Sequence, residues 1–477
     1  MASKCSDDCE KKENSGKNWL QILAVLIGCL TTLQNSIHFS WTSPFFVQLT
    51  KDKDNYDISE EQASYFTTLP PIVQILSCPI FSVLCDRIGR KNALLIGGVP
   101  FILACILEAF AKNVYVFHVA RCLTGVGASA NYIALSMYAG EICQPKVRDF
   151  WVNFLVSISL SGGVLLINFI GFYFDVHQTA YICLVPGMLF LIAFPFMPES
   201  PYYLLMNRRD DAAKDSLKRL LQREDVEEDF QQLKADVKRQ MSETGTWKDL
   251  FCIVANRKAL FAGVLMRVAQ QFGGSAFVAA YTSYIFEESG GDAKTATLIY
   301  SGVFVVVTIM AAFSIDHLGR KMSFVISMFL CAACMLYLSV FYYIKDCVPQ
   351  WDVSNYTWVP LIGMMAYIIF SAFGVSNIPN VMLGELFSAS IKAKGLNVLI
   401  SVMGLLISLT SYLFYLFSSS FGMFTAFLVF SLISFGNAIW CIFVLPETKG
   451  KTLEQIQQEF NGQKLVKPEK LDSQKLV

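Results

Sequence analysis

The sequence has few charged residues, and they are unevenly distributed. Asp, Glu, Lys and Arg make up 16% of its 477 residues, whereas a soluble protein of this length carries about a quarter. None of the four occurs between residues 395 and 445. A straight helix over that stretch would be roughly 75 Å long, against about 30 Å of bilayer hydrocarbon, so we expect a turn at 418–422. The sequence therefore predicts a polytopic α-helical membrane protein.

Further absences exclude other classes of protein. The net charge is zero, which argues against a nucleic-acid partner, and no glycine-rich Walker loop suggests ATP-driven pumping. No catalytic constellation is present, so we expect neither enzymatic activity nor a cofactor. The 14 cysteines lie mostly in apolar segments as packing residues, and Cys5 and Cys9 have no neighbouring ligands, so we expect no metal. The N-terminal segment lacks the features of a secretory signal and is expected to be a polar tail.

Apolar stretches separated by charged or turn-like segments give twelve candidate spans, six on each side of a charged insert. They are expected at 19–42, 62–84, 92–111, 115–140, 150–174 and 178–198, and at 258–286, 294–315, 321–344, 357–387, 395–418 and 421–445. The expected organisation is an N-terminal tail (1–18), a six-helix bundle (19–198), a helical insert (199–256), a second six-helix bundle (257–445) and a C-terminal tail (446–477).

The distribution of Lys and Arg predicts the orientation in the membrane. With an even number of spans both termini lie on one side, and the basic motifs DRIGRK, PKVR, DHLGRK and IKAKG fall on that side. The positive-inside rule then places both termini in the cytoplasm, and we expect the plasma membrane as the location. The sequon at Asn355 would lie outside the cell, where both a glycosylated and an unused site remain open.

Short charged motifs recur in the same order in the two halves. DRIGRK begins at Asp86 and DHLGRK at Asp316, GEICQPKVR corresponds to GELFSASIK, and PESP corresponds to PETKG. In the second pair an acid precedes a base by seven residues, so both lie on one helix face. Three ordered pairs indicate two copies of a six-helix unit.

These charges fall at the cytoplasmic ends of the spans. Topology anchoring explains the cations, but it does not explain the carboxylates beside them. We interpret the set as ion pairs between the two halves that form when the cytoplasmic side is closed, each contributing about 0–1 kcal/mol. The expected gate residues are Asp86, Arg87, Arg90, Glu141, Arg148, Glu199, Asp316, Arg320, Glu385, Lys392 and Glu447.

Further motifs lie along residues 19–460: DRIGRK, DHLGRK, ARCLTGVG, YAGEICQPKVR, PESPYYLL, AQQFGG, GELF and LPETKGKTLEQI. On these motifs the chain resembles the sugar porters of the major facilitator superfamily. The segments SWTSPFF, MLGELF and PETKGKTLEQI look closest to those of the insect facilitated trehalose and glucose transporters. The resemblance implies two pseudo-symmetric six-helix bundles that carry a hexose such as glucose, or trehalose, by alternating access. It further implies a sugar and the lipid bilayer as partners, and we expect a monomer.

The seventh span supplies the candidate sugar site. The amides of Gln270 and Gln271 can donate and accept hydrogen bonds, and the resemblance implies that this pair holds the sugar. Ser275 follows two glycines that would let the helix bend, and Tyr281 resembles the extracellular gate tyrosine of the family. In the tenth span Asn377 replaces a proline of the family motif and Asn380 replaces its tryptophan. We include both asparagines in the candidate site.

Two arginines lie inside predicted spans. Arg121 matches an arginine found throughout the family, which implies a structural or gating role. Arg267 lies one turn before the glutamine pair, where a charge must be paired or hydrated. Two interpretations of Arg267 remain open, a structural ion pair or hydrated position and an attraction for an anionic substrate.

Proton coupling needs a titratable carboxylate in the pathway, and residues 19–50 contain neither Asp nor Glu. His38 is the titratable side chain there, and Glu108 is expected near the outer end of the third span. We therefore expect facilitated diffusion. Two alternatives remain open: a carrier of another polar or anionic organic solute, and a transport-dead nutrient sensor on the same fold.

Overall fold

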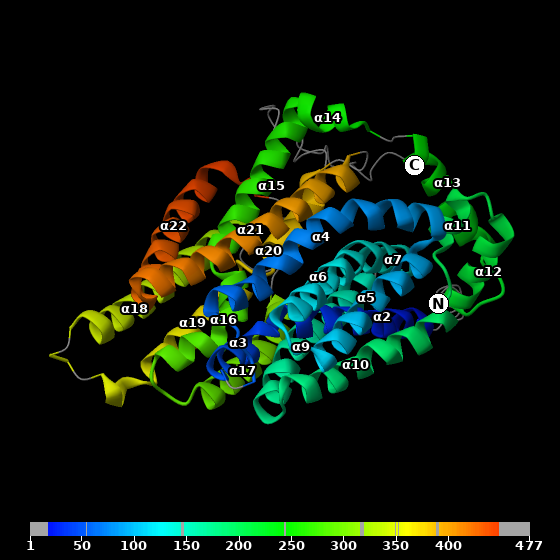
Figure 1. Cartoon of the computed structure of the whole chain (residues 1–477). Helices are drawn as coiled ribbons and strands as arrows, with labels where there is room; N and C mark the ends of the chain where they lie inside the picture. Colours follow the sequence, from blue (N-terminus) through cyan, green and yellow to red (C-terminus); the bar gives the residue numbers. More distant parts are fainter. Residues whose placement is uncertain are drawn as a thin grey trace, which may run out of the picture.

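The computed structural model describes residues 18–53, 55–144, 147–242, 245–314, 319–348, 350–351, 353–387 and 391–447. These residues form a bundle of long helices joined by short connections (Figure 1). We call the end of the bundle at which the first helix begins and the last helix ends the inner end, and the opposite end the outer end.

The first half of the chain contributes six spans. The first consists of α2 (Trp19–Ser40) and α3 (Thr42–Lys51), and the next two are α4 (Glu60–Ile88) and α5 (Arg90–Phe110). The fourth runs through α6 (Val114–Ala130), the π-helical turn η1 (Asn131–Leu135) and α7 (Ser136–Ile142). The turn η2 (Arg148–Val152) leads into α9 (Asn153–Tyr173), and α10 (Val176–Ala193) completes the half.

The second half repeats this arrangement. Its spans are α15 (Val254–Phe272) with α16 (Ser275–Glu288), α17 (Ala293–Ser314), α18 (Arg320–Cys347), α19 (Val359–Ala372) with α20 (Ile378–Leu386), α21 (Lys392–Phe421) and α22 (Met423–Val444). Within the described residues, nine helical segments are long and apolar enough to cross a membrane. The span α6–α7 contains a π-helical turn, and the spans α15–α16 and α19–α20 are broken. With these three the count agrees with the twelve spans expected. The turn expected at 418–422 falls at Gly422, whose φ is +91°.

The breaks in the second half follow from the local sequence. Gly274 separates α15 from α16 with a φ of +96°, a conformation that side chains other than glycine rarely adopt. The hydroxyl of Tyr367 donates to the carbonyl oxygen of Gly273 at 2.8 Å. The amide of Asn377 donates to the carbonyl oxygen of Ala372, at the end of α19, at 2.7 Å. These bonds satisfy backbone groups that a broken membrane helix leaves open.

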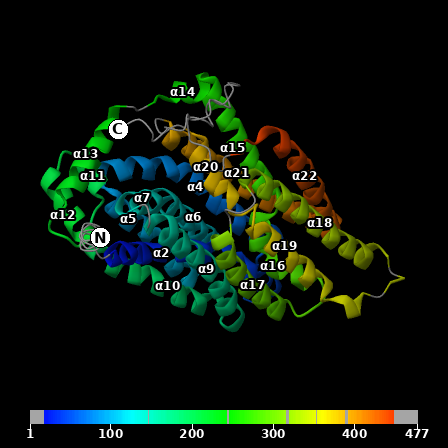
Figure 2. The ribbon, with the colours of Figure 1, turned by 180° about the vertical axis from the view of Figure 1, so that it is seen from behind.

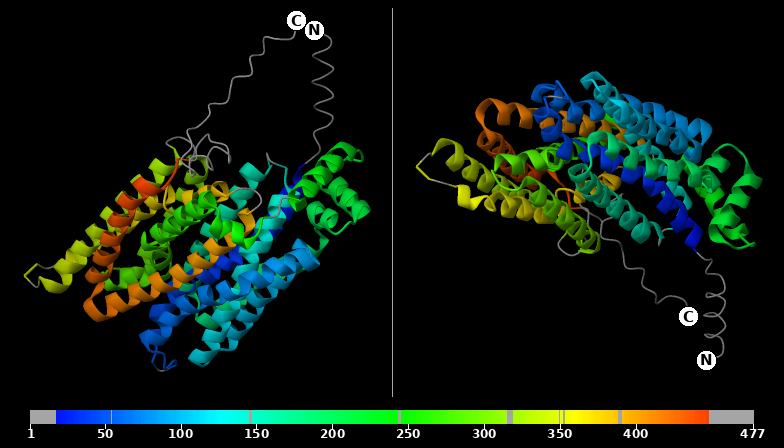
Figure 3. Two further views of the ribbon diagram at one scale, coloured as in Figure 1. Left: turned by 90° about the horizontal axis from the view of Figure 1, so that it is seen from above. Right: turned by 60° about the horizontal axis from the view of Figure 1, so that its bottom comes forward.

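The two halves lie side by side, as the views in Figure 3 show. Helix α4 packs along α21, and α9 packs along α17. Ser408 donates to the carbonyl oxygen of Thr68 at 2.8 Å, and the amide of Asn168 donates to Ser301 at 3.0 Å. The glycine at position 404 lies against the backbone of α4, which is the close approach that small residues permit between membrane helices.

The charged insert forms four short helices. They are α11 (Pro201–Met206), α12 (Asp210–Leu221), α13 (Glu227–Ser242) and α14 (Trp247–Cys252). Figures 1 and 2 show α11, α12 and α13 gathered at the inner end of the first half, beside the start of α2. The amide of Gln21 donates to the carbonyl oxygen of Leu220 at 3.3 Å. Leu220, Leu221 and Phe230 are buried, so the insert is packed onto the bundle.

Candidate functional site

Helix α16 covers the outer end of the space between the halves. Tyr281, which is 1% exposed, forms a hydrogen bond of 3.2 Å between its hydroxyl and that of Thr67 on α4. Its ring centroid lies 5.4 Å from that of Phe46 on α3, in an edge-to-face arrangement. The backbone of α16 departs from helical geometry at Tyr281, with φ −113° and ψ 18°. The tyrosine singled out in the sequence thus bridges the two halves.

Two further contacts join the same helices nearer the surface. The hydroxyls of Ser43 and Ser283 lie 3.0 Å apart, and Lys51 forms an ion pair with Glu287. Each contact joins α3 of the first half to α16 of the second. The outer end is therefore closed in this form of the protein.

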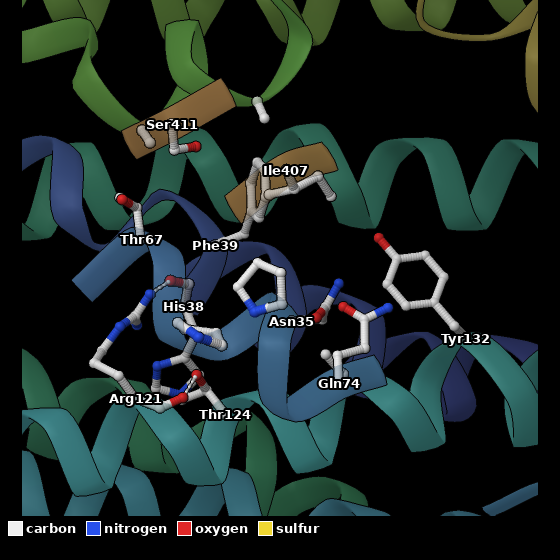
Figure 4. A pocket seen from close by; sticks show the side chains of 15 residues that line it. Asn35, His38, Phe39, Thr67, Gln74, Arg121, Thr124, Tyr132, Ile407 and Ser411 are labelled. Carbon is white, nitrogen blue, oxygen red and sulfur yellow. Dashed lines mark hydrogen bonds between the residues drawn. The ribbon is translucent and has the colours of Figure 1, made fainter. Parts of the chain in front are cut away.

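A cavity lies beneath this closure and is lined by both halves. Figure 4 shows side chains from α2, α4, α6, η1 and α21 converging on it. Its polar lining includes Asn35, His38, Thr67, Gln74, Arg121, Thr124, Tyr132 and Ser411. Asn35, Gln74 and Tyr132 were not among the site residues expected from the sequence. The available signal was their polarity within otherwise apolar spans.

Arg121 stands at the outer part of this cavity, next to His38 (Figure 4). Its Nε donates to the carbonyl oxygen of Phe66 at 3.0 Å, and its Nη2 donates to that of His38 at 2.6 Å. The guanidinium also lies 5.2 Å from the ring centroid of Trp41. Arg121 thereby ties α6 to α2 and α4, which supports the structural role that the resemblance implied.

Glu108 lies behind His38 and is 1% exposed. Its Oε1 is 3.8 Å from Nδ1 of His38, and the imidazole stacks on the ring of Phe101 with 5.6 Å between centroids. The sequence analysis named Glu108 and His38 but did not place them together. A carboxylate in an apolar span signals a buried partner, but it does not say which neighbouring helix supplies that partner.

The glutamine pair lies at the end of α15. Gln270 and Gln271 are 6% and 3% exposed. The hydroxyl of Ser275 donates to Oε1 of Gln271 at 3.1 Å, and the amide of Gln270 donates to the carbonyl oxygen of Ser376 at 3.2 Å. The structure therefore brings Gln270, Gln271 and Ser275 together beside the break between α19 and α20.

Arg267 joins this group from one turn earlier in α15. Its Nη1 donates to Oε1 of Gln270 at 2.7 Å and to Oδ1 of Asn380 at 3.0 Å. Arg267 is 6% exposed, whereas Asn380 is exposed. In the described part of the chain its hydrogen-bond acceptors are thus neutral amides. Asn377, by contrast, uses its amide nitrogen to bond the end of α19.

The charges at the inner end of the first half pair with one another. Nε of Arg90 lies 2.9 Å from Glu141, and its Nη1 lies 3.4 Å from Asp86. Ser200 donates a further hydrogen bond to Glu141. Arg87 is exposed, and its carbonyl oxygen accepts a hydrogen bond from the hydroxyl of Tyr203.

Glu199 and Glu447 occupy corresponding places in the two halves. Glu199 accepts a hydrogen bond from the backbone N–H of Lys91 at 3.1 Å. Glu447 accepts bonds from the backbone N–H groups of Arg320 and Lys321 at 3.0 and 3.2 Å. Each carboxylate therefore caps the first turn of a long helix, α5 or α18, where the helix dipole favours a negative charge.

The ion pairs that Arg90 forms at the inner end lie within the first half. Arg148 is exposed at the start of η2. Asp316 and the side chains of Glu385 and Lys392 lie outside the described residues, so the expected pairing between the halves stays a prediction. Asn355 is exposed on the outer connection between α18 and α19, and its glycosylation likewise stays a prediction.

Two halves of six spans that meet around a central cavity, closed at its outer end by a broken helix, have the architecture of the major facilitator fold. The profile of the family described as "Sugar (and other) transporter" matches residues 25–460. The chain belongs to this family. The family resemblance read from the motifs is therefore confirmed, and the description of this family is that of transporters rather than enzymes.

Curated relatives carry names from the insect transporters. The facilitated trehalose transporter Tret1-1 of Drosophila simulans is 30% identical over 451 residues, which are 93% of this chain and 52% of the relative. The facilitated trehalose transporter Tret1 of Culex quinquefasciatus is 28% identical over 450 residues, covering 93% of this chain and 86% of the relative. The chain spans about half the length of several of these relatives.

Solved structures agree on the fold. The proton:xylose symporter XylE bound to 6-bromo-6-deoxy-D-glucose superposes with a TM-score of 0.73 at 22% identity, covering 93% of this chain and 100% of that one. The inward open conformation of XylE from E. coli gives a TM-score of 0.74 at 20% identity, with coverage of 93% and 100%. The twelve-span architecture expected from the sequence is thus confirmed.

Proposed function

We propose that this protein carries a sugar across the membrane by alternating access, as a facilitative carrier of a hexose such as glucose or of trehalose. The observation that carries the proposal is the cavity between the halves. It is lined by residues of α2, α4 and η1 on one side and of α16 and α21 on the other, and α16 closes its outer end through Tyr281. A rotation of one half against the other would open this end.

The chemistry around the break in α15–α16 suits a sugar. Gln270, Gln271, Ser275 and Asn380 supply amide and hydroxyl groups that both donate and accept hydrogen bonds. The names of the insect relatives also point to a sugar. We propose these four residues as the inner part of the sugar site, with Asn377 supporting the helix break beside them.

The location in the cell is part of the same proposal. We place the protein in the plasma membrane as a monomer, with both ends of the chain in the cytoplasm. The orientation is supported by the basic residues at the inner helix ends, because cytoplasmic loops carry an excess of Lys and Arg. Labelling of an exposed outer residue such as Asn355→Cys on intact cells tests it, since a membrane-impermeant reagent must reach that position from outside.

The test of transport is uptake into proteoliposomes. The purified protein should give saturable uptake of labelled glucose or trehalose, and unlabelled sugar inside the vesicles should accelerate that uptake by counterflow. Vesicles without protein and the mirror-image sugar L-glucose serve as controls. Uptake of both sugars that does not exceed these controls would overturn the proposal.

A further inference from the structure

The described part of the chain contains three buried arginines, and their surroundings differ. Arg90 is 2% exposed and has two carboxylates within ion-pair distance. Arg121 is 1% exposed and bonds two backbone carbonyl oxygens. Arg267 is 6% exposed and bonds two side-chain amide oxygens. Among the described residues neither Arg121 nor Arg267 has a carboxylate within ion-pair distance, and of these two only Arg267 bonds residues of the proposed sugar site.

Neutral amides orient a guanidinium but do not balance its charge. A cation inside a membrane bundle is costly unless it is paired or hydrated, and such residues commonly mark a substrate pathway. The Nε of Arg267 is buried and has no hydrogen-bond partner in the described structure. Arg267 therefore retains both an uncompensated charge and an unused donor.

The position of Arg267 connects it to the proposed sugar site. It shares Gln270 with that site and reaches Asn380, an exposed residue in the first turn of α20. The first turn of α20 adds the positive end of a helix dipole. The local field therefore favours an anion at this place.

We propose that Arg267 binds an anionic group of the substrate, so that the carrier prefers acidic sugars, polyols of hexose size that bear one carboxylate or one phosphate. The inference rests on the proposed sugar carrier and narrows its substrate class. The planar fork of an arginine suits both groups, because two parallel N–H donors meet two oxygens. Gln271 and Ser275 then face the neutral hydroxyls of the same molecule.

The experiment compares charged and neutral sugars in one proteoliposome assay. Glucose, glucuronate and glucose-6-phosphate are offered as labelled substrates, and each is used to compete with the others. We expect at least one acidic sugar to be taken up with a half-saturation concentration roughly tenfold or more below that of glucose, as a charge-assisted hydrogen bond allows. Whichever of glucuronate and glucose-6-phosphate competes better shows whether the carrier prefers a carboxylate or a phosphate.

Three variants test whether Arg267 causes the preference for acidic over neutral sugars. Arg267→Gln should bring the ratio of half-saturation concentrations close to one. Asn380→Asp keeps the arginine but places a carboxylate against it, and it should abolish the preference by competing with the anion. The control Arg209→Gln removes the same charge from an exposed position in the insert and should leave the ratio as it is.

The outcomes separate this inference from the proposed function. Saturable uptake of glucose or trehalose without competition by either acidic sugar overturns the role of Arg267 and leaves the sugar carrier standing. Absence of saturable flux for every sugar, neutral or acidic, overturns the carrier itself. If Arg267→Gln does not elute as a folded protein in detergent, the substrate preference is measured in Arg267→Lys and Asn380→Asp instead. An anion preference that is retained in Asn380→Asp contradicts the inference.

Discussion

The carboxylate of Glu199 accepts a hydrogen bond from the backbone N–H of Lys91, 3.1 Å away, although the two residues lie 108 positions apart in the chain. In the second half, Glu447 stands in the same relation to Lys321 at 3.2 Å. The residue that follows the last span of each half therefore fixes the start of the third span of that half. This contact links the repeated PES and PET motifs to the repeated charged turns.

The glycine of each turn is part of the same contact. Gly89 and Gly319 have φ values of +99° and +87°, and a Cβ atom on them would lie 2.2 Å from Glu199 and 3.0 Å from Glu447 respectively. A side chain at either position would displace the carboxylate. The recurrence of glycine, arginine and lysine in the sequence thus reflects one structural device used twice.

The first prediction concerns these two caps. Glu199→Ala and Glu447→Ala should each destabilise the protein by about 1 kcal/mol, because each removes the acceptor at a helix N-terminus. Thermal unfolding in detergent measures the effect, and the double variant should lose about the sum, since the sites lie in different halves. Glu224→Ala, at a side chain that is 95% exposed, is the control. Stability equal to that of the control in both variants would contradict the capping role.

The second prediction concerns pH. Burial raises the pKa of Glu199 above its ordinary value of 4.5, so the folded state holds its proton more tightly than the unfolded state. The stabilisation from this group is fully present below the unfolded value and is lost as the pH rises through the raised folded pKa. The midpoint of unfolding, relative to that of Glu199→Gln, should therefore increase as the pH falls through this window. If the midpoints of unfolding of the parent and of Glu199→Gln changed in parallel with pH, the raised pKa of Glu199 would be contradicted.

The sequence predicted the architecture well because hydropathy and charge report directly on the bilayer. Twelve spans, the internal repeat and the family followed from span lengths, ordered motifs and basic helix ends. The π-helical turn at Asn131–Leu135 inside the fourth span was not expected. A single-turn change in helical winding leaves hydropathy unchanged, so composition alone does not reveal it.

The site was less predictable because it depends on how neighbouring helices are rotated. The sequence left Arg267 between an ion pair or hydrated position and an anion site, and its second amide partner, Asn380, depends on the packing of α20 beside α15. Glu108 was read as an outer-end residue, and its proximity to His38 depends on the packing of α5 against α2. The spacing of residues along one helix shows which of them share a face, but it does not show which neighbouring helix packs against that face.

The third prediction concerns the outer closure. Tyr281→Phe removes the hydrogen bond to Thr67, and a bond of this kind contributes about 0.5–1.5 kcal/mol. The population open to the outside should then rise about twofold to tenfold. A cysteine at Ser411, in the cavity wall, should react faster with a membrane-impermeant maleimide added outside, in a background without exposed native cysteines.

The matched control for this measurement is Tyr300→Phe, which removes the hydroxyl of another buried tyrosine on α17. Its labelling rate should equal that of the parent. A rate for Tyr281→Phe that does not differ from this control would mean that the hydroxyl does not hold the outer end shut. The packing of the Tyr281 ring on Phe46 would then be sufficient for closure.

The last prediction separates binding residues from supporting ones. Gln271 holds Ser275 through its Oε1, while its amide N–H groups can serve a sugar hydroxyl. Gln271→Ala should raise the half-saturation concentration for sugar about threefold to tenfold, which is the equivalent of one or two neutral hydrogen bonds. The expression level of this variant should be normal. Asn377→Ala removes the bond to the end of α19, so it should lower the unfolding temperature more than the affinity. If Asn377→Ala changed affinity and Gln271→Ala changed only stability, the two roles would have to be exchanged, and the sugar would lie nearer to the break in the tenth span than to the glutamine pair.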